Sequence, residues 1–224
     1  MSVICMASGA EGSLVMKYYP IYLNLKGRKC VVVGGGTVAE RKVISLVEAG
    51  GEVEVISPEI TPKLAEMKSR GVTPHVEREY RPGDLKGAFL VVGATDDSRI
   101  NSSVFREASS VNALVNIVDS PEDCNFIVPS VVRRGDLLIS ISTSGSCPAL
   151  AKKVREDLEK TYGPEYADFL KLLKEFRNEV VRRVKDPEQR KRALRRLLDS
   201  DALELLRAGE TELLEERIKE CMSL

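Results

Sequence analysis

The sequence predicts an α/β fold: a Rossmann-type, doubly wound parallel sheet, followed by a small region of short strands and a helical C-terminal domain. In the first half of the chain, short apolar runs rich in β-branched residues alternate with segments whose apolar residues recur at helical spacing. Such strand–helix alternation favours parallel strands joined by right-handed crossovers. From Pro148 onwards the pattern is almost entirely helical.

The composition indicates a globular protein with no strong overall charge. Of 224 residues, 43% are apolar and 30% are charged, with 34 Lys and Arg against 34 Asp and Glu. A balanced charge gives no overall field that recruits nucleic acid or an anionic membrane. No stretch approaches the roughly 18 apolar residues of a membrane span, and the first residues lack the pattern of a secretory signal. We therefore expect neither nucleic acid nor a membrane as a partner.

The cysteine and histidine content argues against a metal centre. The five cysteines are odd in number and widely spaced, without a C-x-x-C pair. This pattern speaks against a disulfide framework or a zinc site and favours a reducing cytoplasm. The single histidine, His75, lies in a polar, edge-like stretch and is expected to have a surface role. We expect no metal-ligating residues.

The elements expected in the first half form successive strand–helix units. The predicted strands are Cys30–Val33, Val53–Ile56, Phe89–Gly93 and Leu114–Val118. The predicted helices follow Gly36, Thr61-Pro62 and the capping segment Thr95–Ser98, and the first two end at Gly50-Gly51 and near Arg70-Gly71.

After Asp119 the alternation of strands and helices ends. Short extended runs are expected at Phe126–Val128, Val131–Val132 and Leu137–Ser142, as a separate small sheet. Gly163-Pro164, Asp186-Pro187 and Gly209 are expected to separate the later helices, and the charged stretch Arg182–Arg196 is interpreted as a solvated helix face.

The segment Gly34–Ala39 fits the pattern G-x-G-x-x-A between a strand and a helix. Gly34 and Gly36 allow a tight turn and a close approach of the backbone to a pyrophosphate, and the helix N-terminus supplies N–H donors. The context predicts dinucleotide binding through this turn, including Thr37 and Val38. The alternative is an empty glycine turn in a flavodoxin-like sheet.

The ends of the next strands carry further candidates. Pro58 and Glu59 stand about 20 residues after the glycine turn, where an acidic residue binds the adenosine ribose in such folds. No arginine follows to pair with a 2′-phosphate, which favours NAD over NADP. Glu59 could instead only stabilise the N-terminus of the helix that follows. Thr95 ends the third strand, at the edge where ligands bind.

Asp119 ends the fourth predicted strand, close to the expected nicotinamide position. A carboxylate there can accept the proton that leaves when hydride goes to NAD. A turn-initiating Asp before Ser120-Pro121 fits the position equally well.

A second candidate loop joins the last predicted strand to the following helix. Hydroxyls and backbone N–H groups in Thr143, Ser144, Gly145 and Ser146 suit a carboxylate of the substrate. The alternative is an ordinary capped start of the helix at Pro148.

Six segments occur in a characteristic order: Pro20–Leu23, Val33–Lys42, Ala94–Asp97, Asn116–Asp119, Phe126–Ser130 and Gly145–Ala151. Together they resemble the bifunctional precorrin-2 dehydrogenase/sirohydrochlorin ferrochelatase family, which also forms the N-terminal half of siroheme synthase. Cys147 departs from the serine more common in the family.

The resemblance implies NAD-dependent dehydrogenation of precorrin-2 to sirohydrochlorin by a homodimer, with Asp119 as the catalytic residue and nucleotide contacts at Thr37, Val38, Pro58 and Glu59. It leaves open whether the protein also inserts Fe²⁺. The implied domains are an NAD-binding Rossmann domain at 16–120, a dimerisation region at 121–148 and a helical substrate-capping domain at 149–224. Residues 1–15 are expected to be an extension, because the patterned sequence begins at Met16. Candidate cations for the rim of the tetrapyrrole cleft are Arg133, Arg134, Lys152, Lys153 and Arg155.

Two alternatives remain beside this interpretation. One is an enzyme that dehydrogenates and leaves iron insertion to a separate chelatase. The other is a regulatory NAD-sensing module without catalysis, which requires neither Asp119 nor the segment Thr143–Ala151.

Overall fold

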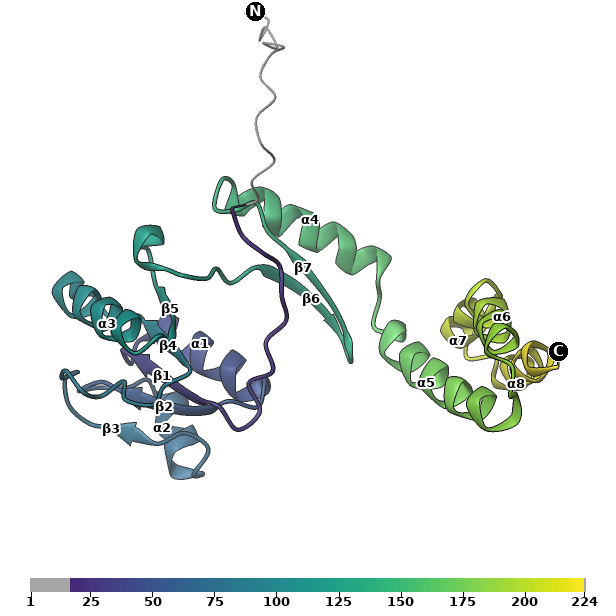
Figure 1. Ribbon diagram of the computed structural model, residues 1–224, viewed down its shortest axis with the longest axis horizontal. Helices are drawn as coiled ribbons and strands as arrows, with labels where there is room; N and C mark the ends of the chain where they lie inside the picture. The colour runs from purple at the N-terminus through teal and green to yellow at the C-terminus, as the bar shows by residue number, and fades with distance from the viewer. Residues whose placement is uncertain (1–16, 224) are drawn as a thin grey trace, which may run out of the picture. The chain divides into compact units, whose positions relative to one another are not determined.

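The computed structural model describes residues 17–223 and divides into two compact units (Figure 1). The first unit ends at Ile127 and the second begins at Val128. The extension expected at residues 1–15 lies outside the described residues.

The first unit is built on a parallel five-stranded sheet in the order β3-β2-β1-β4-β5. Its strands are β1 (Lys29–Val33), β2 (Glu52–Ile56), β3 (His75–Val76), β4 (Leu90–Gly93) and β5 (Leu114–Ile117). Val33 at the end of β1 pairs with Ile56 on one side and with Gly93 on the other. The carboxyl ends of the three central strands therefore meet at one edge, and the predicted doubly wound sheet is confirmed.

Helices cover both faces of this sheet because residues along each strand alternate between two cores. Helices α1 (Thr37–Glu48) and α2 (Pro62–Ser69) bury Ala39, Val43 and Leu64 on one face. Helix α3 (Ser98–Ser110) buries Val104 and Ala108 on the other. Within β1, Cys30 and Val32 belong to the first core, and Val31 and Val33 to the second.

Two local expectations in this unit differ from the structure. Strand β3 was not predicted as an element, because two residues are too few to show a period. Residues Phe126–Val128, expected to be extended, form no strand. The Asn125 side chain accepts a hydrogen bond from the Val115 N–H (2.8 Å) and donates to the Ala113 carbonyl (3.0 Å), which bends the chain back onto β5 after the short 3-10 helix Pro121–Asp123.

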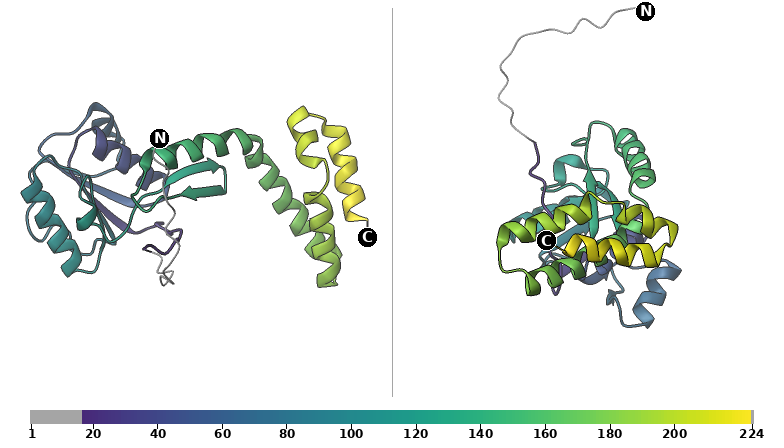
Figure 2. Two further views of the ribbon diagram at one scale, coloured as in Figure 1. Left: turned by 90° about the horizontal axis from the view of Figure 1, so that it is seen from above. Right: turned by 90° about the vertical axis from the view of Figure 1, so that its right-hand side faces the viewer.

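The second unit begins with an antiparallel hairpin and continues as helices. Strands β6 (Ser130–Arg134) and β7 (Leu137–Ile141) pair across Gly135, near two of the predicted short runs. The helices are α4 (Pro148–Thr161), α5 (Glu165–Arg183), α6 (Pro187–Leu198), α7 (Ala202–Ala208) and α8 (Thr211–Met222). Helices α5 to α8 pack side by side around an apolar core that includes Phe176, Val180 and Leu197 (Figure 2). Three of the boundaries fall at the predicted separators Gly163-Pro164, Asp186-Pro187 and Gly209, whereas the break between α6 and α7 was not predicted.

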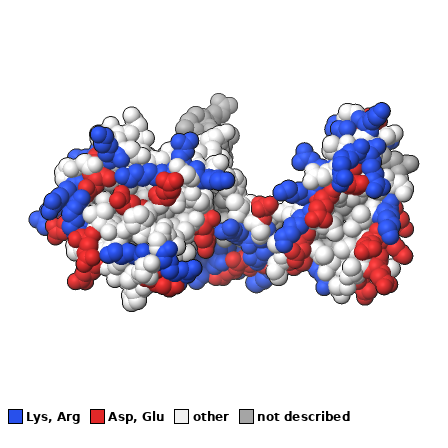
Figure 3. All heavy atoms as spheres, turned by 90° about the horizontal axis from the view of Figure 1, so that it is seen from below, with Lys and Arg blue, Asp and Glu red and all other residues white. Residues whose placement is uncertain are grey.

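The surface mixes charges of both signs. On the face drawn in Figure 3, basic and acidic side chains are interspersed over both units. Within the stretch Arg182–Arg196, Arg182 pairs with Glu179 and Lys191 with Glu188, and both basic side chains are 74% exposed, in agreement with a solvated face. None of the helices described between residues 17 and 223 has the length and apolar character needed to cross a bilayer.

Candidate functional site

A cavity of about 610 Å³ lies at the carboxyl ends of β1, β2 and β4. It is lined by residues of the glycine turn, of the loop after β2, of the segment after β3 and of the loop after β4. All seven side chains or glycines predicted to bind the cofactor line it: Gly34, Gly36, Thr37, Val38, Pro58, Glu59 and Thr95. The fold thus brings together residues from three separate loops.

The glycine turn fits closely against its neighbours. Gly34 has a φ of +122°, and a Cβ built on it lies 2.3 Å from the Ala94 carbonyl oxygen, so a side chain is excluded at this position. A Cβ on Gly35 lies 1.9 Å from the Glu59 carbonyl oxygen. The Thr61 N–H also donates to the Gly35 carbonyl (3.1 Å), which fixes the loop carrying Glu59 against the turn.

Gly36 differs from the two glycines before it. It has a φ of −78°, and a Cβ built on it meets no described atom within 4 Å. As the N-cap of α1, Gly36 leaves the first helical N–H groups without a side-chain cap among the described residues. Open space beside uncapped N–H donors at a helix N-terminus fits the pyrophosphate of a dinucleotide.

The loop after β4 is held by a buried asparagine. The Asn101 side chain donates to the Thr95 carbonyl (2.9 Å) and accepts from the Thr95 hydroxyl (3.0 Å). Asp97 caps α3 by accepting from the Arg99 N–H (2.8 Å). Hydrogen bonds from the Arg99 side chain and backbone hold the pKa of Asp97 below its ordinary value, so this carboxylate stays ionised at neutral pH.

The charged side chains that line the cavity are acidic. They are Glu59, Glu79, Asp96 and Asp97, and no Lys or Arg occurs among its described lining residues. A bound anion must therefore be held by backbone N–H groups and the α1 dipole rather than by a cationic side chain.

Asp119 lies two residues beyond β5, at the same edge of the sheet. It is exposed, has a φ of +61° and sits in a turn closed by the Ser120 N–H to the Ile117 carbonyl (3.3 Å). The backbone of Asp119 therefore forms a turn, as the second of the two interpretations of this residue predicted. Asp119 does not line the cavity, and its catalytic role stays a prediction.

The segment Thr143–Ser146 belongs to the second unit. The Thr143 hydroxyl accepts from the Cys147 N–H (3.1 Å), and its carbonyl accepts from the Ser146 N–H (2.9 Å). Cys147 is the N-cap of α4 and its side chain makes no cap hydrogen bond, so these bonds of Thr143 hold the turn before the helix and not the helix itself. Ser144, Gly145 and Ser146 are exposed, and their binding of substrate stays a prediction.

Several residues of the site were missed by sequence reasoning. Tyr80, Glu79 and Ile100 line the cavity, and Asn101 supports it. Tyr80 and Glu79 follow a two-residue strand in a stretch without periodicity, so no pattern in the sequence pointed to them. His75, expected at the surface, is half-buried: its Nε2 donates to the Ser57 carbonyl (2.8 Å), while Lys68 donates to its Nδ1 (3.3 Å).

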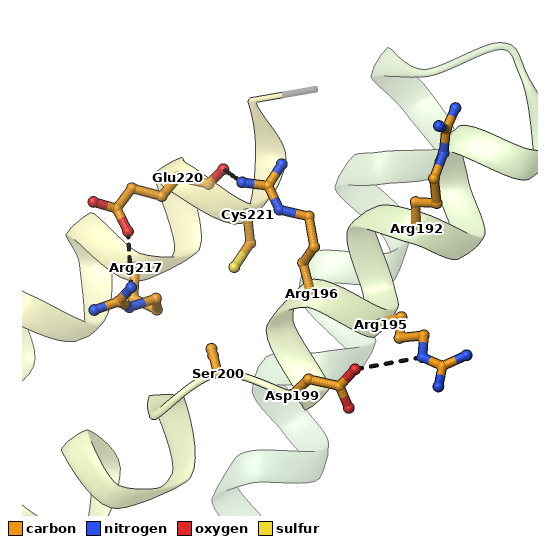
Figure 4. A pocket seen from close by; sticks show the side chains of 8 residues that line it. All are labelled: Arg192, Arg195, Arg196, Asp199, Ser200, Arg217, Glu220 and Cys221. Atoms are coloured by element: carbon orange, nitrogen blue, oxygen red, sulfur yellow. Dashed lines mark hydrogen bonds and ion pairs between the residues drawn. The ribbon is translucent and has the colours of Figure 1, made fainter.

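A second cavity, of about 490 Å³, is lined by residues of α6, of the turn that follows it and of α8 (Figure 4). Three of its four arginines take part in structural contacts. Arg196 donates to the Ser223 carbonyl (2.7 Å), and Arg195 pairs with Asp199 (3.4 Å). Arg217 pairs with Glu220 (3.1 Å). Across residues 17–223 no three His, Cys, Asp or Glu side chains gather as a metal-binding group.

The fold and the first cavity define a dinucleotide-binding α/β protein. Three family models match along the chain: putative NAD(P)-binding over residues 21–130, sirohaem biosynthesis protein central over 134–161, and sirohaem synthase dimerisation region over 165–222. The chain belongs to the family shared by precorrin-2 dehydrogenases and the N-terminal part of siroheme synthase. The predicted dimerisation region, 121–148, precedes the range of the dimerisation model, and the predicted domain boundaries stay predictions.

Individual relatives agree with this assignment. The siroheme synthase of Methylobacillus flagellatus is 43% identical over 176 residues, which is 79% of this chain and 38% of the relative. That of Thioalkalivibrio sulfidiphilus is 36% identical over 207 residues, 92% of this chain and 42% of the relative. The chain thus spans about two fifths of these curated relatives. A solved structure named SirC, precorrin-2 dehydrogenase, superposes with a TM-score of 0.77 at 28% identity, covering 91% of this chain and 100% of the other.

Proposed function

We propose that this protein is an NAD-dependent precorrin-2 dehydrogenase that forms sirohydrochlorin in siroheme biosynthesis. The observation that carries the proposal is the cavity at the sheet edge, where Gly36 leaves open space beside uncapped N–H groups of α1. The solved structure named as a precorrin-2 dehydrogenase supports the choice of reaction, because its whole length aligns with this chain.

The charge of the cavity supports NAD rather than NADP. The exposed Glu59 follows β2, where the adenosine ribose lies in such folds. A carboxylate accepts hydrogen bonds from ribose hydroxyls but repels a 2′-phosphate. The lining contains four acidic residues and no described Lys or Arg, so the 2′-phosphate that distinguishes NADP from NAD has no counter-charge there.

Different segments of this chain bind the nucleotide, accept the proton and bind the substrate. The bound nicotinamide supplies the hydride acceptor, while the turn Gly34–Val38 binds and orients the dinucleotide through its backbone. Asp119 accepts the proton that precorrin-2 loses with the hydride. Thr143, Ser144, Gly145 and Ser146 are the candidate ligands of substrate carboxylates, through their hydroxyls and N–H groups.

The proposal extends to assembly and location. We infer a homodimer, in line with the match of residues 165–222 to a dimerisation region. The four cysteines in the described part are free, and Cys30 and Cys221 are buried among apolar residues, which fits a reducing cytoplasm. Insertion of Fe²⁺ into sirohydrochlorin stays an open second activity.

Anaerobic turnover tests this function directly. Purified protein with precorrin-2 and NAD should produce NADH and sirohydrochlorin in equal amounts, and NADP should support a lower kcat/KM. Absence of NADH formation, with precorrin-2 intact, would reject the proposal. A separate incubation with sirohydrochlorin and Fe²⁺ measures chelation, with Fe²⁺ and sirohydrochlorin in buffer alone as the control.

A further inference from the structure

One wall of the cavity is held in place by a carboxylate that does not line it. Glu107, on the third turn of α3, accepts a hydrogen bond from the Tyr80 hydroxyl. It also accepts from the N–H groups of Gly83 and Leu85, each at 3.0 Å. A single half-buried side chain thus ties the whole segment after β3 to α3.

The hydrogen bond from the Tyr80 hydroxyl to Glu107 fixes the position of the Tyr80 ring. Burial and the neighbouring Glu107 carboxylate raise the pKa of Tyr80 well above its ordinary value, so the phenol keeps its proton and donates at neutral pH. The Tyr80 ring packs against the core between the sheet and α3, together with Ile100. Both side chains also line the cavity. The ring therefore has one fixed position, set by its hydroxyl and its core contact.

The position of Tyr80 within the cavity corresponds to the adenosine end. The glycine turn follows β1, Glu59 follows β2, and Tyr80 follows β3, the next strand outward in the sheet. Asp119 follows β5, on the opposite side of β1. A dinucleotide whose pyrophosphate crosses at β1 and whose ribose reaches Glu59 has its adenine toward Tyr80 and Ile100.

We propose that Tyr80 and Ile100 form the adenine-binding wall of this cavity, and that Glu107 is a positioning residue that acts on the nucleotide through Tyr80. An aromatic ring and an aliphatic side chain suit the flat, apolar faces of a purine. This inference rests on the nucleotide binding proposed above.

Calorimetric binding of NAD and ADP-ribose to the full chain tests the wall. Tyr80→Ala should weaken both ligands about tenfold, within the range for loss of one base–aromatic contact. Tyr80→Phe keeps the ring but loses the hydrogen bond to Glu107, so its affinities for both ligands should fall between those of wild type and Tyr80→Ala. In turnover, Tyr80→Ala should raise the KM for NAD with kcat unchanged, because the reacting end of the nucleotide is untouched.

A double-mutant cycle tests the positioning role. Glu107→Ala should weaken NAD about tenfold when Tyr80 is present and have little further effect in the Tyr80→Ala background. Glu107→Gln, which keeps one acceptor oxygen, should fall between wild type and Glu107→Ala and serves if the alanine variant does not fold. Additive losses in the cycle would show that Glu107 does not act through Tyr80 and would overturn that role.

The outcomes separate this inference from the function on which it rests. If wild type binds NAD and Tyr80→Ala binds it equally well, the adenine wall is wrong and the proposed function stands. If wild type binds neither NAD nor ADP-ribose, both fail.

Discussion

The side chain of Asn101 forms hydrogen bonds with both the carbonyl and the N–H group of Thr95. Its amide donates to the Thr95 carbonyl (2.9 Å), and its oxygen accepts from the Thr95 N–H (3.4 Å). Asn101 lies in the first turn of α3 and is 9% exposed, whereas Thr95 lies in the loop after β4 and lines the cavity. The start of the helix therefore fixes the backbone of the loop that faces the nucleotide.

Replacement of Asn101 should loosen this loop. Asn101→Ala leaves polar groups of Thr95 without their partner, and we expect a loss of about 1–3 kcal/mol in unfolding free energy. NAD affinity should fall as well. Urea unfolding and calorimetry measure the two effects, with the exposed Asn178→Ala as a control that changes stability by about 0.5 kcal/mol or less. Unchanged stability would show that the network does not hold the loop.

Substitution of Gly36 should separate folding from nucleotide binding. Asp at this position meets open space and is a preferred N-cap residue, so Gly36→Asp should be as stable as wild type. Its carboxylate would stand where the pyrophosphate binds, and NAD binding should be abolished. Thermal unfolding and NAD titration check both outcomes.

The matched variants for the glycine turn are Gly36→Ser and Gly34→Ala. The serine caps without a charge and should retain more NAD affinity than the aspartate. The alanine at Gly34 meets the Ala94 carbonyl at a positive φ and should destabilise the fold itself. Full NAD affinity in Gly36→Asp would place the pyrophosphate elsewhere.

Asp119 should matter for turnover but not for NAD affinity. Asp119→Asn keeps the shape and tolerates the φ of +61°, but it cannot accept a proton at neutral pH. We expect precorrin-2 oxidation to slow by about 100-fold, the scale of a lost general base, with the Kd for NAD unchanged. The exposed Glu122→Gln removes the same charge nearby and should leave turnover intact. Equal rates for wild type and Asp119→Asn would exclude Asp119 from proton transfer.

The pair of Asp84 and Arg78 should make stability depend on pH. Asp84 accepts two hydrogen bonds of 2.8 Å from the Arg78 guanidinium, which hold the pKa of Asp84 below its ordinary value. A depressed carboxyl pKa contributes stability above the unfolded pKa, about 3.9, and this contribution is lost as the pH falls through the folded pKa. Asp84→Asn should cost about 1 kcal/mol at pH 7.

Calorimetry between about pH 7 and pH 2 tests that sign, because the range spans the ordinary pKa of Asp. The difference between wild type and Asp84→Asn should be full at neutral pH and shrink below about pH 4. A difference that is constant over this range would show that ionisation of Asp84 contributes nothing to stability.

Much of the first unit could be predicted from its sequence. The β-branched runs gave four of the five strands, and the pattern G-x-G-x-x-A located the turn at Gly34–Ala39. Strands and amphipathic helices are readable because burial repeats along them with a fixed period. Strand β3 carries no such signal, since its two residues form a strand only by pairing with β2.

Some residues of the candidate site could likewise be predicted from the sequence, and others could not. Glycines and strand-end residues such as Glu59 and Thr95 were found because their chemistry follows from their place after a strand. Tyr80 and Glu107 were missed because 27 residues separate them and only the packing of the β3 segment on α3 joins them.

The sequence by itself determined the order of strands and helices, the glycine turn and the family, since each depends on residues close together in the chain. The tertiary structure decided which distant side chains share one cavity and which carboxylates hold its walls. It did so because hydrogen bonds such as those from the N–H groups of Gly83 and Leu85 to Glu107 join a loop to a helix more than 20 residues later, which only the folded chain brings within about 3 Å of each other.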